Sequence, residues 1–167
     1  PAPTFAEHDR ARAVHELLVA TGVEAELVQH TDVIPNVYAR FPGEDSRLPA
    51  LLISAHTDTV FPAATDLTVT RDEAAGRIAG PGIGDNSLAV AALIAVARGL
   101  VSAGIEGWRP RCDVYLVANA GEEGLGNLGG IRAAAEHLAG AAPGGLGAAV
   151  VLERSEERRV GKECIGK

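Results

Sequence analysis

Short apolar runs alternate along the chain with longer segments in which apolar residues recur every three or four positions. An unbroken run of four to six apolar residues is typical of a strand covered on both faces, and the longer period is typical of a helix packed on a sheet. The pattern predicts buried strands at residues 50–54, 114–117 and 148–152, and helices at residues 88–101 and 127–138. Strands that alternate with helices favour an α/β fold, so we expect a three-layer sandwich with a mostly parallel mixed central sheet.

The amino-terminal part of the chain predicts a further helix. Thr4 and Glu7 have the spacing of a capping box, which would begin a helix that ends at Gly22. The remaining predicted strands are residues 25–28, 36–41, 67–70 and 77–79, of which the last two form a hairpin outside the central sheet.

Composition and charge exclude several function classes. The chain has 167 residues, which suits one domain, and its formal net charge of -7 argues against binding nucleic acid, where Lys and Arg must neutralise phosphates. No apolar run approaches the roughly 20 residues of a membrane span, and no secretory signal is visible, so we expect no membrane contact and a cytoplasmic location. Two cysteines are too few for a disulfide framework, and Cys112 is expected to be a buried, inert thiol.

The last fourteen residues differ in composition from the rest. Residues 1–153 contain ten Arg and no Lys, whereas residues 154–167 contain both lysines of the chain, three Arg and three Glu. The string from Arg154 to Cys164 also resembles the in-frame translation of a common sequencing adapter. We therefore expect residues 1–153 to be part of one catalytic domain and residues 154–167 to be a non-native tail. A genuine charged tail is the alternative.

Side chains that bind metals stand at the ends of the predicted strands and before the long helix. Ligands gather beyond the carboxyl ends of the strands in an open α/β sheet, so we expect these side chains to meet. Each alone has an ordinary interpretation, such as a helix cap or a solvated acidic pair, but chance placement of the whole set is improbable. The set is His56 and Asp58 after the first strand, Asp85 before the helix, Glu122 and Glu123 after the second strand, and Glu153 at the end of the last.

These residue types suit zinc. Zinc takes imidazole nitrogen and carboxylate oxygen, and a catalytic site keeps one position for water. Asp85 has two oxygens and could bridge two cations, whereas Asp58 could anchor the second ring nitrogen of His56. Of the adjacent Glu122 and Glu123, one can bind a cation while the other faces the bound water as a general base.

Three strings, in order along the chain, carry a resemblance to a known family. The strings are Ser54-Ala55-His56-Thr57-Asp58-Thr59-Val60, Gly80-Pro81-Gly82-Ile83-Gly84-Asp85-Asn86 and Ala120-Gly121-Glu122-Glu123-Gly124. With them, the sequence resembles the co-catalytic zinc peptidases and amidohydrolases over residues 1–153; this family includes acetylornithine deacetylase, succinyl-diaminopimelate desuccinylase, glutamate carboxypeptidase and tripeptide aminopeptidase. The resemblance leans toward the tripeptide aminopeptidase-like members, because Asn86-Ser87-Leu88 stands where many members have Asp-Lys-Gly or Met-Lys-Gly.

The resemblance implies a zinc-exopeptidase fold with two Zn²⁺ in the intact site; Co²⁺ or Mn²⁺ would suit similar ligands. It assigns His56, Asp85 and Glu153 to one cation, and it assigns the bridging Asp85 together with Glu123 to the other. It also implies a cis peptide bond between Asp85 and Asn86. The family has a further His ligand and a lid domain with dimer contacts that this sequence lacks. We therefore expect a truncated chain with little or no activity, and a homodimer only in the intact protein.

The implied activity is hydrolysis of an amide or peptide bond, in a small peptide or N-acyl amino acid, by a metal-bound hydroxide. Glu122 would be the general base and Asp58 would orient His56. Aminopeptidase, carboxypeptidase and deacetylase activities stay open. The other four histidines have no motif around them and are expected at the surface: His8, His15, His30 and His137.

Two competing interpretations stay open. The glycines of residues 80–84 suggest a nucleotide-binding domain, but the loop lacks the Gly-Lys-Ser/Thr ending of a phosphate loop, and Asp85 would repel phosphate. The other interpretation is an inactive metal-binding domain, because the absent ligand and lid would weaken the second zinc site.

If residues 154–167 are non-native, the natural gene continues past Glu153 with a different sequence. Sequencing the gene in its source genome tests this prediction. A reading frame that still encodes the segment from Arg154 to Cys164 would contradict it.

Overall fold

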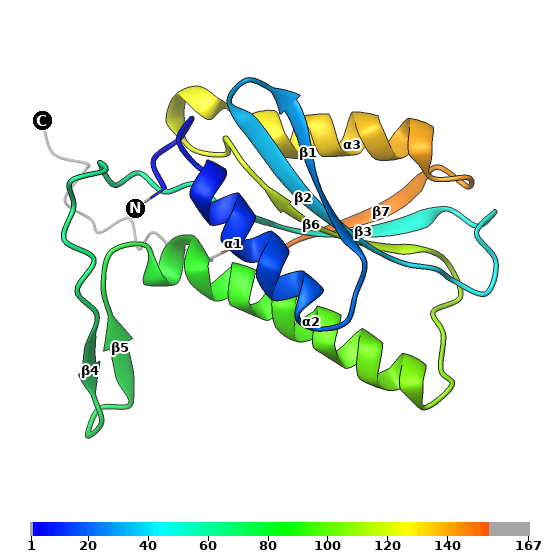
Figure 1. The fold of residues 1–167 in the computed structure, drawn as a ribbon, viewed down its shortest axis with the longest axis horizontal. Helices are drawn as coiled ribbons and strands as arrows, with labels where there is room; N and C mark the ends of the chain where they lie inside the picture. The colour runs from blue at the N-terminus through cyan, green and yellow to red at the C-terminus, as the bar shows by residue number, and fades with distance from the viewer. Residues whose placement is uncertain (1, 154–167) are drawn as a thin grey trace, which may run out of the picture.

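The computed structural model describes residues 2–153, so the tail expected at residues 154–167 lies outside the described residues. A five-stranded sheet forms the centre, in the order β1-β2-β6-β3-β7 (Figure 1). Its strands are β1 (Ala25–Thr31), β2 (Ile34–Phe41), β3 (Ala50–His56), β6 (Val114–Asn119) and β7 (Leu146–Val151).

The direction of the strands brings three carboxyl ends to one edge of the sheet. β3 pairs in parallel with both β6 and β7, whereas β2 is antiparallel to its neighbours β1 and β6. Four of the five strands therefore run the same way, which confirms the mostly parallel mixed sheet. Ser54 of β3 lies opposite Val117 of β6 and Val151 of β7, so the segments that follow these three strands emerge side by side.

Helices cover both faces of the sheet, which gives the three layers that the sequence predicted (Figure 1). Helices α1 (His8–Val19) and α2 (Leu88–Ile105) pack on one face, where Leu18, Leu93 and Leu116 are fully buried. Helix α3 (Gly129–Ala141) packs on the other face through Leu138, against Leu52 and its neighbours. A separate hairpin of β4 (Thr70–Asp72) and β5 (Arg77–Ala79) projects away from the sheet, as expected.

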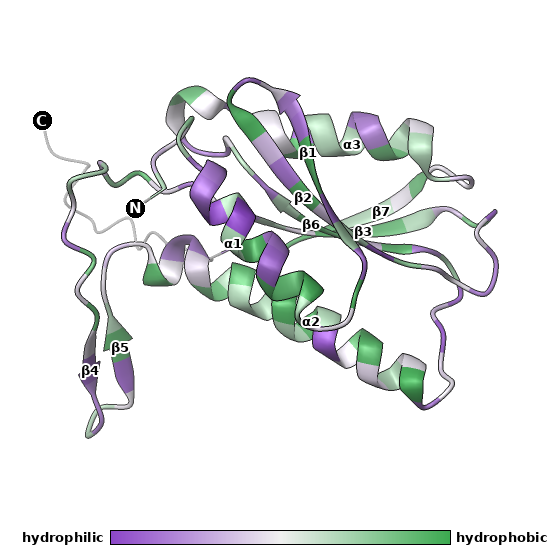
Figure 2. Cartoon of the chain, viewed as in Figure 1, coloured by the Kyte–Doolittle hydropathy of each residue, from purple (hydrophilic) through white to green (hydrophobic). Residues whose placement is uncertain are grey.

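Helix α2 corrects one expectation about apolar length. The segment Ile83–Ile105 contains an 18-residue window with a mean hydropathy of 2.1, which is long and apolar enough to cross a membrane by length and composition alone. Helix α2 is hydrophobic along most of its length (Figure 2). Its inward side chains, among them Leu93 and Ala97, lie in the core beneath the sheet. One face of α2 therefore packs on the sheet, whereas only 28% of its apolar window is buried within the described residues.

Two local predictions are wrong. Strand β7 was expected to be buried, but it lies at the edge of the described sheet, and most of its residues are exposed, including Val151. The capping box is absent, because Glu7 makes no side-chain cap hydrogen bond at the start of α1. Other element boundaries shift by a few residues: α2, for example, passes through Gly104 and ends at Ile105.

The carboxylate of Asp113 fastens the start of β6 to the loop after β2. The Asp113 side chain is fully buried and accepts hydrogen bonds from the Gly43 N–H, the Ser46 hydroxyl and two guanidinium nitrogens of Arg40. Burial alone would raise the pKa of Asp113, but these hydrogen bonds and the charge of Arg40 lower it below its ordinary value.

We predict that Asp113→Asn lowers the free energy of unfolding by about 1–3 kcal/mol at pH 7, because buried donors lose their acceptor. The pKa of Asp113 is depressed in the folded state, so its contribution is complete above the unfolded pKa and is lost as pH falls through the folded one. The difference between wild type and variant in urea unfolding should therefore shrink below pH about 4. The exposed Asp72→Asn is the control, and a difference that grew on acidification would contradict the assignment.

Candidate metal centre

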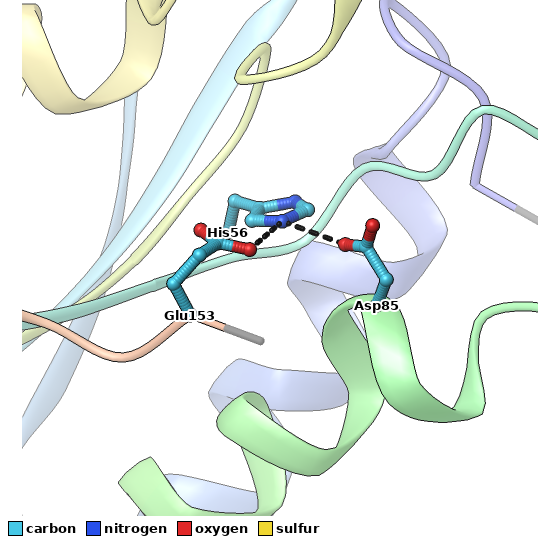
Figure 3. Close-up of side chains that lie close together, drawn as sticks. All are labelled: His56, Asp85 and Glu153. Atoms are coloured by element: carbon cyan, nitrogen blue, oxygen red, sulfur yellow. Dashed lines mark hydrogen bonds and ion pairs between the residues drawn. The ribbon is translucent and has the colours of Figure 1, made fainter. Parts of the chain in front are cut away.

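His56 is the last residue of β3 and the most buried of the candidate metal ligands. Its side chain is 2% exposed, and its Nδ1 lies 3.1 Å from the backbone oxygen of Asp58 and 3.4 Å from the Asp58 carboxylate. Its Nε2 points away from this anchor, 3.1 Å from Asp85 Oδ1 and 3.3 Å from Glu153 Oε1 (Figure 3). One ring nitrogen is therefore anchored by protein, and the other faces two carboxylates.

A sharp turn before α2 presents Asp85. The turn begins at Gly82, whose φ of 70° favours glycine, and a Cβ there would lie 3.2 Å from the Thr59 side chain. The Asp85–Asn86 peptide bond is cis, which confirms that prediction. The fully buried Asn86 donates a hydrogen bond to the Leu152 carbonyl at 3.1 Å, so the turn is tied to the residue before Glu153.

The loop after β6 presents Glu122 and Glu123. Their backbone N–H groups donate to the two oxygens of the Asp58 carboxylate, at 3.0 and 2.8 Å. The loop also folds back closely on itself, because a Cβ on Gly126 would lie 2.6 Å from the backbone of Gly121. Asp58 thus fixes the backbone of both glutamates as well as the ring of His56.

Two groups of side chains could each hold a cation. His56, Asp85 and Glu153 form one group, and His56, Glu122 and Glu123 form the other; within each, the ligand atoms lie within 4.8 Å of one another. One imidazole nitrogen binds one cation, and Nε2 of His56 lies between Asp85 and Glu153, so we assign His56 to the first group. Within residues 2–153, Asp85 and Glu123 do not fall in one group of three, although the resemblance pairs them.

The first group has an unsatisfied acceptor. The Nε2 of His56 carries at most one hydrogen, and its geometry suits Glu153 Oε1. Asp85 Oδ1 is buried and has no hydrogen-bond partner among the residues that the structure describes. A buried carboxylate oxygen without a donor is costly, and a cation between His56, Asp85 and Glu153 would satisfy it. The donor set of one imidazole and two carboxylates fits zinc.

The charges around His56 shift the pKa values of the site. Burial alone would lower the pKa of His56, but its hydrogen bond to Asp58 and the negative charges of Glu153, Asp58 and Glu122 raise it to about 9. Burial would likewise raise the pKa of Asp58, yet hydrogen bonds from His56, from the two glutamate N–H groups and from Thr4 lower it.

Both loop glutamates hold protons more strongly than usual. Burial raises the pKa of Glu122, and the charges of Glu153, Asp58 and Asp85 add to this rise. Burial raises the pKa of Glu123 most, and the negative charges of Asp85 and Glu122 raise it further. Carboxylates gathered in this way repel one another, and a cation at the site would relieve the repulsion.

Sequence reasoning missed several polar residues that hold the loops. Asn36, fully buried in β2, accepts the Ala120 N–H and donates to the Gly130 carbonyl. The sequence indicates this role only through a lone amide side chain within an apolar strand, because a buried amide requires hydrogen-bond partners. Thr4 and Glu7 had been given a local role as a helix cap.

Three of the four remaining histidines, and Cys112, are half-buried rather than exposed or fully buried as expected. His8 is exposed as expected, but His15, His30 and His137 are half-buried. His30 lies 2.6 Å from the Tyr38 hydroxyl through its Nε2, and its ring contacts that of His137 edge-on. Cys112 is a free, half-buried cysteine rather than a fully buried one.

Comparison with solved structures shows the same fold in a metallo-carboxypeptidase and in two dipeptidases. Sso-CP2, an M20 family metallo-carboxypeptidase from Sulfolobus solfataricus, is 19% identical with a TM-score of 0.65, over 91% of this chain and 34% of its own. The dipeptidase Dug1p from Saccharomyces cerevisiae is 20% identical with a TM-score of 0.62, and the match covers 92% of this chain and 36% of Dug1p. Human carnosine dipeptidase 1 is 17% identical with a TM-score of 0.60, and the match covers 85% of this chain and 32% of the dipeptidase. The chain thus spans about a third of each structure's length.

Sequence comparison gives the family. No curated protein sequence matches the chain. The profile of peptidase family M28 matches residues 36–158, a segment that contains all three motif strings and Glu153. With the folds of the solved relatives, this match confirms the resemblance to the co-catalytic zinc peptidases. The chain belongs to peptidase family M28.

Proposed function

We propose that the protein is a two-zinc metallohydrolase that cleaves the amide or peptide bond of a small peptide or N-acyl amino acid. The observation that carries the proposal is the buried Asp85 Oδ1, which has no donor within residues 2–153 although it lies 3.1 Å from His56 Nε2. An acidic group placed so needs a cation, and the residues around it are zinc ligands by type.

His56, Asp85 and Glu153 would hold one cation, and Glu123 would hold the second with Asp85 as the bridge. Two bound zinc ions would lower the pKa of a shared water and polarise the scissile carbonyl. Asp58 keeps the Nδ1 side of His56 occupied and so leaves Nε2 for the cation. Asn86 holds the Asp85 turn against the carbonyl before Glu153, which keeps both carboxylates on one side of the ring.

Glu122 would act as the general base. Its backbone is fixed by the Asp58 carboxylate, while its side chain lies in the second group with Glu123. The raised pKa of Glu122 makes its carboxylate a better proton acceptor, and the same group would then deliver the proton to the leaving amine.

A peptide substrate is the narrower part of the proposal. Family membership and the similar structures, which include two dipeptidases and a metallo-carboxypeptidase, support a peptide over an N-acyl amino acid. Asp85 and Glu153 are 39% and 42% exposed, so solvent reaches the cation position. We propose that this chain alone hydrolyses slowly, because donors in an open site stabilise charge less than donors in a dry one.

We predict that the wild-type chain binds zinc and that Asp85→Ala loses most of it, because Asp85 belongs to the first group and would bridge to the second cation. Elemental analysis after zinc titration and gel filtration measures this, with Asp72→Ala on the outlying hairpin as the matched control. A folded wild-type chain that bound no zinc would contradict the metal centre. Equal zinc content in both variants would contradict the role of Asp85.

We predict that Glu122→Gln lowers kcat by about 10²–10⁴-fold without loss of zinc, because the amide cannot accept the proton. The assay is dipeptide hydrolysis by a family member that contains the whole catalytic domain and carries the equivalent change. The exposed Glu136→Gln on α3 is the control. Retained turnover in the zinc-loaded variant would refute the assignment of the base.

A further inference from the structure

The amino-terminal segment, residues 2–10, contacts three of the four segments that carry or position the proposed ligands: the residues after β3, the loop after β6 and the turn before α2. It runs beside the residues after β3, where the Ala2 carbonyl accepts the Thr59 N–H at 2.8 Å and Pro3 forms a parallel bridge with Thr59. Three of its side chains then reach into the site region, each toward a different loop. The three are Thr4, Glu7 and Arg10.

Thr4 contacts the residue that organises the site. Its hydroxyl donates to Asp58 Oδ2 at 2.9 Å and lies 3.5 Å from the Glu123 carbonyl. Asp58 Oδ2 also accepts the Glu123 N–H, so the hydroxyl supports the same oxygen that holds the glutamate loop. A carboxylate supported in this way is restricted in rotation, and its hydrogen bond to His56 is restricted with it.

Glu7 holds the start of the glutamate loop. Its side chain is fully buried, and Oε1 accepts the Gly121 N–H at 2.9 Å. Oε2 has no hydrogen-bond partner within residues 2–153, and burial raises the pKa of Glu7. Burying a half-satisfied carboxyl group is costly, and nothing at the start of α1 uses this one as a cap. Its position is explained by Gly121, whose N–H would otherwise be buried without an acceptor.

Arg10 contacts the turn that presents Asp85. Its Nη2 donates to the Ser87 hydroxyl at 2.8 Å, two residues after Asp85 and at the start of α2. Helix α1 does not need these polar contacts to dock, because Ala11, Val14 and Leu18 already bury its apolar face in the core. The polar contacts are therefore additional to docking, and all three converge on the loops of the site.

We propose that residues 2–10 are a positioning segment of the metal centre, in which Thr4, Glu7 and Arg10 each fix one ligand-bearing loop. The inference rests on the proposed metal centre and deepens it. Thr4 acts through Asp58 on His56, Glu7 acts through Gly121 on Glu122 and Glu123, and Arg10 acts through Ser87 on Asp85. Loss of one such support loosens the ligand arrangement without removing any ligand, so it weakens cation binding while the chain stays folded.

Cobalt binding to the whole chain tests the proposal, because Co²⁺ suits the same ligands and its visible absorption reports their geometry. Thr4→Val removes the hydroxyl, and Glu7→Leu removes the acceptor at similar volume. Each should raise the Kd for Co²⁺ by about 10- to 100-fold and change the absorption bands of the saturated site. Thr4→Ser and Glu7→Gln keep an oxygen at the same position and should bind Co²⁺ nearly as tightly as the wild type.

Thr21→Val is the matched control. The Thr21 hydroxyl donates to the Leu18 carbonyl at the far end of α1, so its loss removes a threonine hydrogen bond of the same helix away from the site. This variant should lower Tm but leave the cobalt Kd and spectrum unchanged.

Three results would overturn the proposal. Wild-type binding in both Thr4→Val and Glu7→Leu would show that the segment only docks α1. Equal weakening in Thr21→Val would show that stability alone controls binding. A folded wild-type chain that bound no Co²⁺ would overturn the metal centre itself, a failure distinct from the first two.

Discussion

The carboxylate of Asp58 is fully buried, and it accepts hydrogen bonds from the Thr4 hydroxyl and from the backbone N–H groups of Glu122 and Glu123, beside the ring of His56. A buried charge is tolerated only when its oxygens are satisfied, and here the donors come from segments far apart in the sequence. These hydrogen bonds lower the pKa of Asp58, so the group stays charged. Satisfying this one carboxylate requires that the loops after β3 and β6 take the places they have.

The sheet supplies the other constraint. Because β3, β6 and β7 are parallel and in register, the segments after them leave the same edge of the sheet. Of the candidate ligands, His56 is the most buried, with its Nε2 facing Asp85 and Glu153, both of which reach solvent. The arrangement is a buried, anchored imidazole beneath a ring of partly exposed carboxylates, and a cation would approach from the open side.

The candidate metal ligands could be predicted from the sequence because their positions follow from strand ends, and strand ends follow from apolar runs. His56, Asp85 and Glu153 meet at the edge where the pattern placed them. The supporting residues could not be predicted in this way. Thr4 and Glu7 satisfy a local capping rule, yet their partners lie 54 and 114 residues away, and tertiary hydrogen bonds outweigh the cap. The exposure of β7 could not be predicted either, because an apolar run does not reveal how many neighbours a strand has.

Without a bound cation, the buried carboxyl groups at this edge of the sheet lower the free energy of unfolding. The pKa values of Glu122 and Glu123 are raised by burial and by the neighbouring carboxylates, and Asp85 Oδ1 and Glu7 Oε2 are buried without donors among the residues described. Each of these features costs stability, and none contributes to the apolar core. Features that cost stability in this way are typical of a binding site, because residues that serve binding are often unfavourable for folding. Cations bound between the carboxylates would offset that cost, because a ligand that binds only the folded state stabilises it. Cation binding at the proposed site would therefore be coupled to folding, with Asp58 holding the loops in place.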